Sequence, residues 1–214
     1  MKKIGIIGSG GVAKTLGLGF LKHGYEVMLG SRSPEKLEEW KNSDAPQVQT
    51  GNMAEAAAFG DIIVLAVKGT AAQAALELAG AVNLEGKTIV DASNPIADAP
   101  PVNGVLQFFT EPNYSLMEAL QKAQPGAHFV KAFSSVGAGL MVNPPFPTRP
   151  SMFICGNNEA AKEEVKHILD LFGWETEDMG AVEAARAIEP LCMLWCIPGF
   201  RSNQWTHAFH LLKL

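Results

Sequence analysis

The sequence predicts an α/β fold: a doubly wound, mostly parallel sheet followed by a short helical C-terminal segment. Three observations support this fold class. A glycine-rich turn follows a short apolar run at the N-terminus, further apolar runs alternate with helical patterns, and no internal repeat interrupts this alternation. Successive βα units of this kind pack as a parallel sheet between two layers of helices. We therefore expect a main domain at residues 1–181 and a helical segment at residues 182–214 that completes a cleft or a dimer interface.

The first element is an apolar run at residues 3–7 that breaks into the pattern Gly8-x-Gly10-x-x-Ala13, and a helical pattern begins at Lys14. A short apolar run bounded by glycine is typical of a buried strand. Gly8 permits a tight turn, Gly10 lets a pyrophosphate approach the backbone, and Ala13 allows close packing of the helix. The free N–H groups of the helix attract phosphate.

The pattern predicts a Rossmann-type dinucleotide site, and a βα turn without ligand is the alternative. The predicted contacts are Gly8, Ser9, Gly10, Gly11, Val12 and Ala13.

The second strand, expected within residues 24–33, indicates which nucleotide binds. An acid that would bind the ribose 2′-hydroxyl belongs at its end, but Ser31, Arg32 and Ser33 stand there instead. A guanidinium and two hydroxyls can bind a 2′-phosphate, which a carboxylate would repel. Ser33 resembles a helix N-cap, which would bring Lys36 within reach of the same phosphate. The predicted cofactor is NADP(H), and the alternative is that Arg32 and Lys36 are ordinary surface charges.

The rest of the chain continues the alternation. Strands are expected at residues 61–67, 87–92, 128–133, 152–155 and 174–178, and helices at residues 70–81, 115–123, 159–172 and from 182 onward. Ligands of a doubly wound sheet lie beyond the carboxyl ends of its strands, so the following loops should form the site. These loops are residues 67–69, 93–95 and 133–135. Two proline-rich stretches, residues 94–114 and 142–150, either cover the site or only connect elements.

Composition excludes several classes of function. The 214 residues carry a net charge of −5, and no basic stripe is present that would bind nucleic acid. The longest uncharged apolar stretch, residues 191–200, is far shorter than the ~20 residues that a membrane span needs. Three cysteines indicate reduced thiols rather than a disulfide framework. We expect a cytoplasmic protein that binds neither nucleic acid nor membrane.

Several segments, in order and over nearly the whole chain, together resemble the coenzyme F420-dependent NADP oxidoreductase family. These segments are residues 8–13, 30–33, 61–67, 91–95, 125–133 and 179–190. The resemblance implies a compact NADP-binding Rossmann domain, usually in a homodimer, that passes hydride between NADP(H) and a deazaflavin, coenzyme F420. In the related STEAP metalloreductases the corresponding domain reduces a flavin, so FMN or FAD is a second expectation.

The resemblance also assigns residues by position. Ser9 to Ala13 would hold the pyrophosphate, and Ser31, Arg32 and Lys36 the 2′-phosphate. The residues implied around the nicotinamide are Val67, Asn94, Pro95, Ala132 and Phe133. The predicted loops after the strands add Lys68 and Ser134 as cofactor contacts. The chain departs from the family at Ser134-Ser135, where Asn-Thr or His-Thr is expected, and in residues 96–114. Both departures lie where a second substrate would stack.

No catalytic side chain is assigned. Reduction of a ketone or imine usually needs a positioned acid, but neither tyrosine is followed four residues later by lysine. Hydride transfer between two flat rings depends mainly on proximity and orientation. The remaining candidate acids or bases are Lys68, Asp91, Lys131 and His207. Two other functions stay open: an NADPH-binding redox sensor without turnover, and a small-carbonyl or imine reductase.

A metal site is not expected. Cys192, Cys196, His207 and His210 have helical spacing, but the cysteines lie in an apolar helix where thiols act as small hydrophobic groups. Trp195 and Phe200 in the same region are expected to pack in the core or at a dimer interface.

Overall fold

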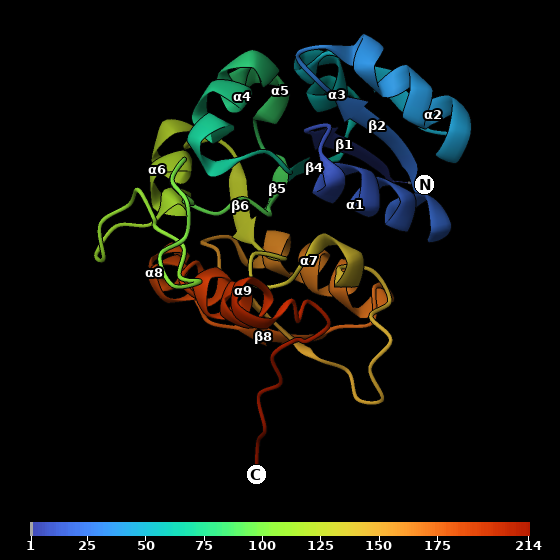
Figure 1. Cartoon of the computed structure of the whole chain (residues 1–214). Coiled ribbons are helices and arrows are strands. Elements are labelled where there is room, and N and C mark those ends of the chain that lie inside the picture. The colour runs from blue at the N-terminus through green and yellow to red at the C-terminus, as the bar shows by residue number, and fades with distance from the viewer. Residues whose placement is uncertain (1) are drawn as a thin grey trace.

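The computed structural model describes residues 2–214 and contains a six-stranded, wholly parallel sheet with the strand order β3-β2-β1-β4-β5-β6 (Figure 1). The strands are β1 Lys3–Ile7, β2 Glu26–Gly30, β3 Gln49–Gly51, β4 Ile62–Leu65, β5 Thr88–Asp91 and β6 His128–Lys131. The order reverses between β1 and β4, and a doubly wound sheet binds its ligands at such a point. The predicted fold class is confirmed.

Helices pack on both faces of this sheet. They are α1 Gly11–Lys22, α2 Glu38–Asp44, α3 Met53–Phe59, α4 Ala72–Ala79, α5 Ala81–Leu84, α6 Leu116–Ala123, α7 Glu159–Leu171, α8 Ala185–Ile188 and α9 Leu191–Ser202. Side chains of α1 and α7 share one core with Ile4 and Ile6 of β1. Side chains of α3, α4 and α6 share the opposite core with Ile7. Burial on both faces explains why β1 is a continuous apolar run.

Several boundaries differ from the sequence-based expectation. α1 begins at Gly11 rather than Lys14. The alanine-rich helix expected at residues 70–81 is interrupted at Gly80, whose φ of 83° is left-handed. The helix start expected after Ser33 is present as a 3-10 helix, Pro34–Leu37, that leads into α2, although the Ser33 side chain makes no capping hydrogen bond. The prediction omitted β3 and α3, although Asn52 and Glu55 form a capping box that begins α3. That box is a readable helix start.

The C-terminal third adds a separate strand pair. β7 Ser151–Ile154 and β8 Glu175–Asp178 are parallel and connected by α7. They do not extend the parallel sheet, because their link to it is an antiparallel bridge between Lys131 and Cys155. The segment expected to be helical to residue 214 ends as a helix at Ser202, since Asn203 takes a left-handed φ of 52°. Figure 1 shows the last residues leading away from α9.

Two further observations concern the long connections and membranes. Residues 96–108 form an arm closed by antiparallel bridges between Ile96 and Phe108 and between Val102 and Val105. Within residues 2–214, no helix combines the length and the apolar character needed to cross a membrane.

Candidate nucleotide and hydride-transfer site

The glycine-rich turn between β1 and α1 contains two glycines with different roles. Gly8 has a φ of 141°, and a Cβ there would overlap the carbonyl oxygen of Ala66, so the turn itself requires glycine. A Cβ on Gly10 would meet no protein atom within 4 Å. Gly10 is the N-cap of α1 and offers no side-chain hydrogen bond to the helix, so the first N–H groups of α1 have no side-chain cap. The open space at Gly10 can therefore hold an anionic ligand.

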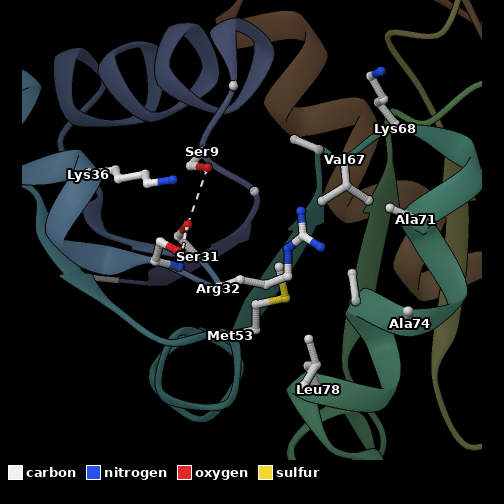
Figure 2. Close-up of a pocket in the computed structure, with 15 residues that line it drawn as sticks. Ser9, Ser31, Arg32, Lys36, Met53, Val67, Lys68, Ala71, Ala74 and Leu78 are labelled. Atoms are coloured by element: carbon white, nitrogen blue, oxygen red, sulfur yellow. Dashed lines mark hydrogen bonds between the residues drawn. The ribbon is translucent and has the colours of Figure 1, made fainter.

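A cavity of about 420 Å³ lies beside this turn (Figure 2). The hydroxyl of Ser31 at the end of β2 donates to the Ser9 hydroxyl at 3.3 Å, and the Ser33 backbone N–H donates to the Ser31 hydroxyl at 3.1 Å. These bonds connect the turn after β1 to the loop after β2. Arg32 and Lys36 also line the cavity, and Figure 2 shows their cationic ends on two sides of it. Among residues 2–214, no acidic side chain lines it, so the cavity favours an anion.

The wall opposite the turn is apolar. It is formed by one face of α4 with the turn before it and by Met53 at the start of α3; the lining residues are Met53, Ala71, Ala74, Ala75 and Leu78. Sequence reasoning did not assign this wall to the site. A signal was present, because positions 71, 74, 75 and 78 lie on one helical face.

A second cavity of about 520 Å³ adjoins the first, and both are lined by Gly10, Ala66, Val67 and Lys68. Its remaining walls come from the start of α1, the end of β5 and the arm at residues 96–99. Its charged lining residues are Lys68 and Asp98, which are exposed and face each other with 3.6 Å between Nζ and Oδ1. The cavity is otherwise lined by small and apolar side chains and by Asn94.

Asn94 links the loops after β5 and β6. Its Nδ2 donates to the carbonyl oxygen of Ser134 at 2.8 Å. Its Oδ1 and the Ser134 hydroxyl are buried and have no hydrogen-bond partner within residues 2–214. A buried polar atom without a partner is uncommon and costly, so a ligand that donates to Asn94 Oδ1 would be stabilised here.

The two adjoining cavities form what we call the groove. Most of the predicted contacts line it, but some do not. Those that line one or both cavities are Gly8, Ser9, Gly10, Gly11, Val12, Ser31, Arg32, Ser33, Lys36, Val67, Lys68 and Asn94. Five predicted residues are buried and line neither cavity: Ala13, Pro95, Ala132, Phe133 and Ser134. Ala13 packs in the core, as expected of a small residue under the helix. The Phe133 ring contacts Phe172 in the core, with 6.1 Å between ring centroids, and therefore faces away from the cavity.

Of the four candidate acids and bases, only Lys68 lines a cavity. Asp91 and Lys131 are fully buried and form an ion pair, with Glu189 as a third member. Burial alone would lower the pKa of Lys131, but the two carboxylates outweigh it and raise that pKa. Because Lys131 is fully buried and lines neither cavity, it is out of reach of a substrate there. His207 Nε2 contacts the Trp195 carbonyl oxygen at 2.9 Å, and its ring stacks on the Trp195 ring.

The residues considered for a metal have other neighbours. Cys192 and Cys196 lie on α9, and His210 Nδ1 contacts the carbonyl oxygen of Arg149 at 3.1 Å. Within the described residues 2–214, no group of three or more His, Cys, Asp or Glu side chains could hold a metal ion. Burial raises the pKa of the third thiol, Cys155, to about 12, so it stays protonated at neutral pH.

Comparisons with known proteins agree with this fold and indicate the family. Residues 3–95 match the model of the family described as NADP oxidoreductase coenzyme F420-dependent. A proposed F420-dependent NADP-reductase from Arthrobacter sp. FB24 has a solved structure that superposes with a TM-score of 0.93 at 30% identity, over 100% of both chains. The F420-dependent NADP reductase of Methanocaldococcus jannaschii is 28% identical over 90% of each chain. Rat metalloreductase STEAP3 is 30% identical over 92% of this chain, which spans only 38% of that relative.

Proposed function

Because the chain belongs to the family of coenzyme F420-dependent NADP oxidoreductases, we propose that it transfers hydride between NADPH and a deazaflavin of the F420 type or a flavin. One observation supports this most strongly. The second cavity adjoins the anion-binding cavity, is lined mainly by small and apolar groups, and has no buried acid or base in its lining. Transfer between two flat rings needs proximity and orientation more than a proton donor.

Each part of the groove suits one part of NADPH. The backbone at Gly10 and the start of α1 would hold the pyrophosphate. Arg32 and Lys36, with the hydroxyls at the end of β2, would hold the 2′-phosphate. The apolar wall on α4 with Met53 would contact the adenine ring. The nicotinamide would then lie toward the second cavity, where Asn94 Oδ1 is free to accept a hydrogen bond from its carboxamide.

When bound, NADPH supplies the hydride, and the side chains of this protein place and shield the rings. Val67 and the arm at residues 96–99 line the second cavity, where they would contact a flat partner. Lys68 and Asp98 stand at the exposed rim, where they contact solvent. Because this rim is open to solvent, water would supply the proton that accompanies the hydride onto the acceptor.

The test is anaerobic NADPH oxidation with separate acceptors: F420, FMN, FAD, a ferric chelate and a quinone. We expect turnover with F420 or a flavin, and faster turnover with NADPH than with NADH. Binding of NADPH without turnover of any acceptor would indicate the redox sensor. A cyclic imine and a small ketone complete the panel, and turnover with these alone would indicate a small-carbonyl or imine reductase. The homodimer and the cytoplasmic location stay predictions, and light scattering of the purified protein tests the first of them.

A further inference from the structure

A buried charged cluster contacts the loop after β5, whose residues Ala92 and Asn94 line the second cavity. Lys131 Nζ is 2.7 Å from Asp91 Oδ2 and 2.9 Å from Glu189 Oε1, and the three side chains are at most 2% exposed. Asp91 ends β5 and Lys131 ends β6, whereas Glu189 follows α8 in the C-terminal segment. The three residues form what we call the 91–131–189 cluster, which combines two carboxylates with one ammonium.

The cluster holds the loop after β5 through Ser93. Asp91 Oδ1 accepts hydrogen bonds from the backbone N–H of Ser93 at 2.9 Å and from its hydroxyl at 2.5 Å. Lys131 Nζ donates to the Ser93 carbonyl oxygen at 2.9 Å. Donor and acceptor groups of Ser93 are therefore all fixed by the cluster. The next residue is Asn94, which lines the second cavity and donates to the Ser134 carbonyl oxygen.

Glu189 connects the same cluster to two distant elements. Its Oε2 accepts from the Leu116 N–H at 3.0 Å, and its Oε1 accepts from the Met117 N–H at 3.0 Å. A carboxylate at the first turn of α6 satisfies N–H groups that the helix leaves free and interacts favourably with the helix dipole. The C-terminal segment is thereby tied to α6 and to the ends of β5 and β6.

Stability alone is a weak explanation for such a cluster. Removing three charged side chains from water is costly, and well-packed apolar residues often serve a core at least as well. What apolar residues could not do is fix the polar groups of Ser93 in one orientation. The cluster fixes Ser93 directly before Asn94, the residue that lines the second cavity.

We propose that the 91–131–189 cluster is a positioning device for the nicotinamide half of bound NADPH, and that it acts through Ser93 by placing Asn94 Oδ1. None of its members lines either cavity, so they are positioning residues rather than catalytic ones. The inference rests on the proposed function, because it assumes that the groove holds NADPH.

Binding of two ligands, NADPH and adenosine 2′,5′-bisphosphate, tests the two ends of the groove separately. Adenosine 2′,5′-bisphosphate carries the groups expected at Arg32 and Lys36 but has no nicotinamide. In Glu189→Gln we expect NADPH affinity to fall about fivefold, as for the loss of one well-placed hydrogen bond, with bisphosphate affinity unchanged within about twofold. Ser93→Ala removes only the hydroxyl from the cluster and should cause a smaller loss in the same direction. Calorimetry or the fluorescence of bound nucleotide measures both affinities.

The matched control is Asp178→Asn. Asp178 also pairs with a buried lysine, Lys162, and also accepts from a backbone N–H, that of Gly180, but it lies on β8 and lines neither cavity. We expect it to leave both affinities unchanged, whatever its effect on the melting temperature. A loss in Asp178→Asn equal to that in Glu189→Gln would overturn the proposal, because general destabilisation would then explain both.

A double-variant cycle tests whether the cluster acts through Asn94. In the Asn94→Ala background, Glu189→Gln should cause no further loss of NADPH affinity, because the atom that it positions is gone. Equal losses for both ligands, no loss for either, or full additivity with Asn94→Ala would overturn the proposal. If Glu189→Gln fails to fold, Ser93→Ala supplies the same comparison. A wild-type protein that binds neither ligand would refute the proposed function itself, a distinct result.

Discussion

At the Arg32 end of the groove, the ligand-facing charges are exposed side chains from one short stretch, residues 31–36. At the Asn94 end, the cavity depends on buried contacts among β5, β6, α6 and the C-terminal segment. The first end can change its ligand preference without disturbing the core. At the second end, the position of the nicotinamide ring depends on the packing among these four parts of the chain. We therefore expect substitutions at the Arg32 end to change which nucleotide binds, and substitutions at the Asn94 end to change hydride transfer.

The largest effect is expected at Gly10, which both cavities share. Gly10→Val should weaken NADPH binding more than about 100-fold, because the branched side chain fills the pyrophosphate space. The fold should survive, since a Cβ there meets no protein atom within 4 Å. Gly139→Val is the control, because Gly139 has equally free space and lines neither cavity. Affinity within about threefold of wild type would contradict Rossmann-type binding at this turn.

A smaller and more selective effect is expected at Arg32. Arg32→Ala should lower NADPH affinity about tenfold and leave NADH affinity nearly unchanged, because NADH lacks the phosphate that the guanidinium contacts. Titration of both nucleotides by fluorescence provides the internal control. Equal losses for the two nucleotides would mean that Arg32 contacts something other than the 2′-phosphate.

Lys68 is the candidate acid that the structure leaves at the cavity, so its removal tests for proton transfer. Lys68→Ala should lower kcat by much less than the ~100-fold typical of a lost general acid. Asp98→Ala, which removes its exposed partner, should have a similarly small effect. A decrease of about 100-fold in Lys68→Ala, with nucleotide binding intact, would favour a carbonyl or imine substrate.

The smallest effect is expected at the surface contact of α6. A hydrogen bond from Arg186 holds the pKa of Glu118 at about 2, below its ordinary value of 4.5. The contribution of this pair to the free energy of unfolding is therefore complete above about pH 5. It is lost as the pH falls toward the pKa of Glu118 in the folded protein. Because water screens the pair, Arg186→Gln should cost at most about 1 kcal/mol near pH 7. Urea unfolding should show this difference shrinking between about pH 5 and pH 3, and a constant difference would contradict the assignment.

The same contrast explains what the sequence could predict. The Arg32 end consists of short stretches of sequence: the turn at Gly8 and Gly10, and residues 31–36. Residue types and spacing within each stretch were therefore enough to predict it. The helix expected at residues 115–123 was predicted for the same reason, and α6 begins there with a capping box between Ser115 and Glu118.

The Asn94 end could not be derived in this way. Glu189 meets Lys131 only through tertiary packing, and no local pattern marks it as the partner of a buried lysine. Asp91 and Lys131 were predicted only as candidate acids or bases, because sequence does not reveal that they neutralise each other. The antiparallel bridge at Cys155 and the end of the last helix at Ser202 likewise depend on contacts distant in sequence.

The central claim is that hydride passes directly from NADPH to a flat acceptor in the second cavity. The most direct measurement uses NADPH deuterated at the transferred position of the nicotinamide, mixed anaerobically with the deazaflavin F420. Direct transfer predicts that the deuterium is recovered on the reduced carbon of the deazaflavin, and that unlabelled NADPH in heavy water leaves that carbon without deuterium. Recovery of the label in solvent, or NADPH that stays unoxidised with F420, FMN and FAD alike, would contradict the claim.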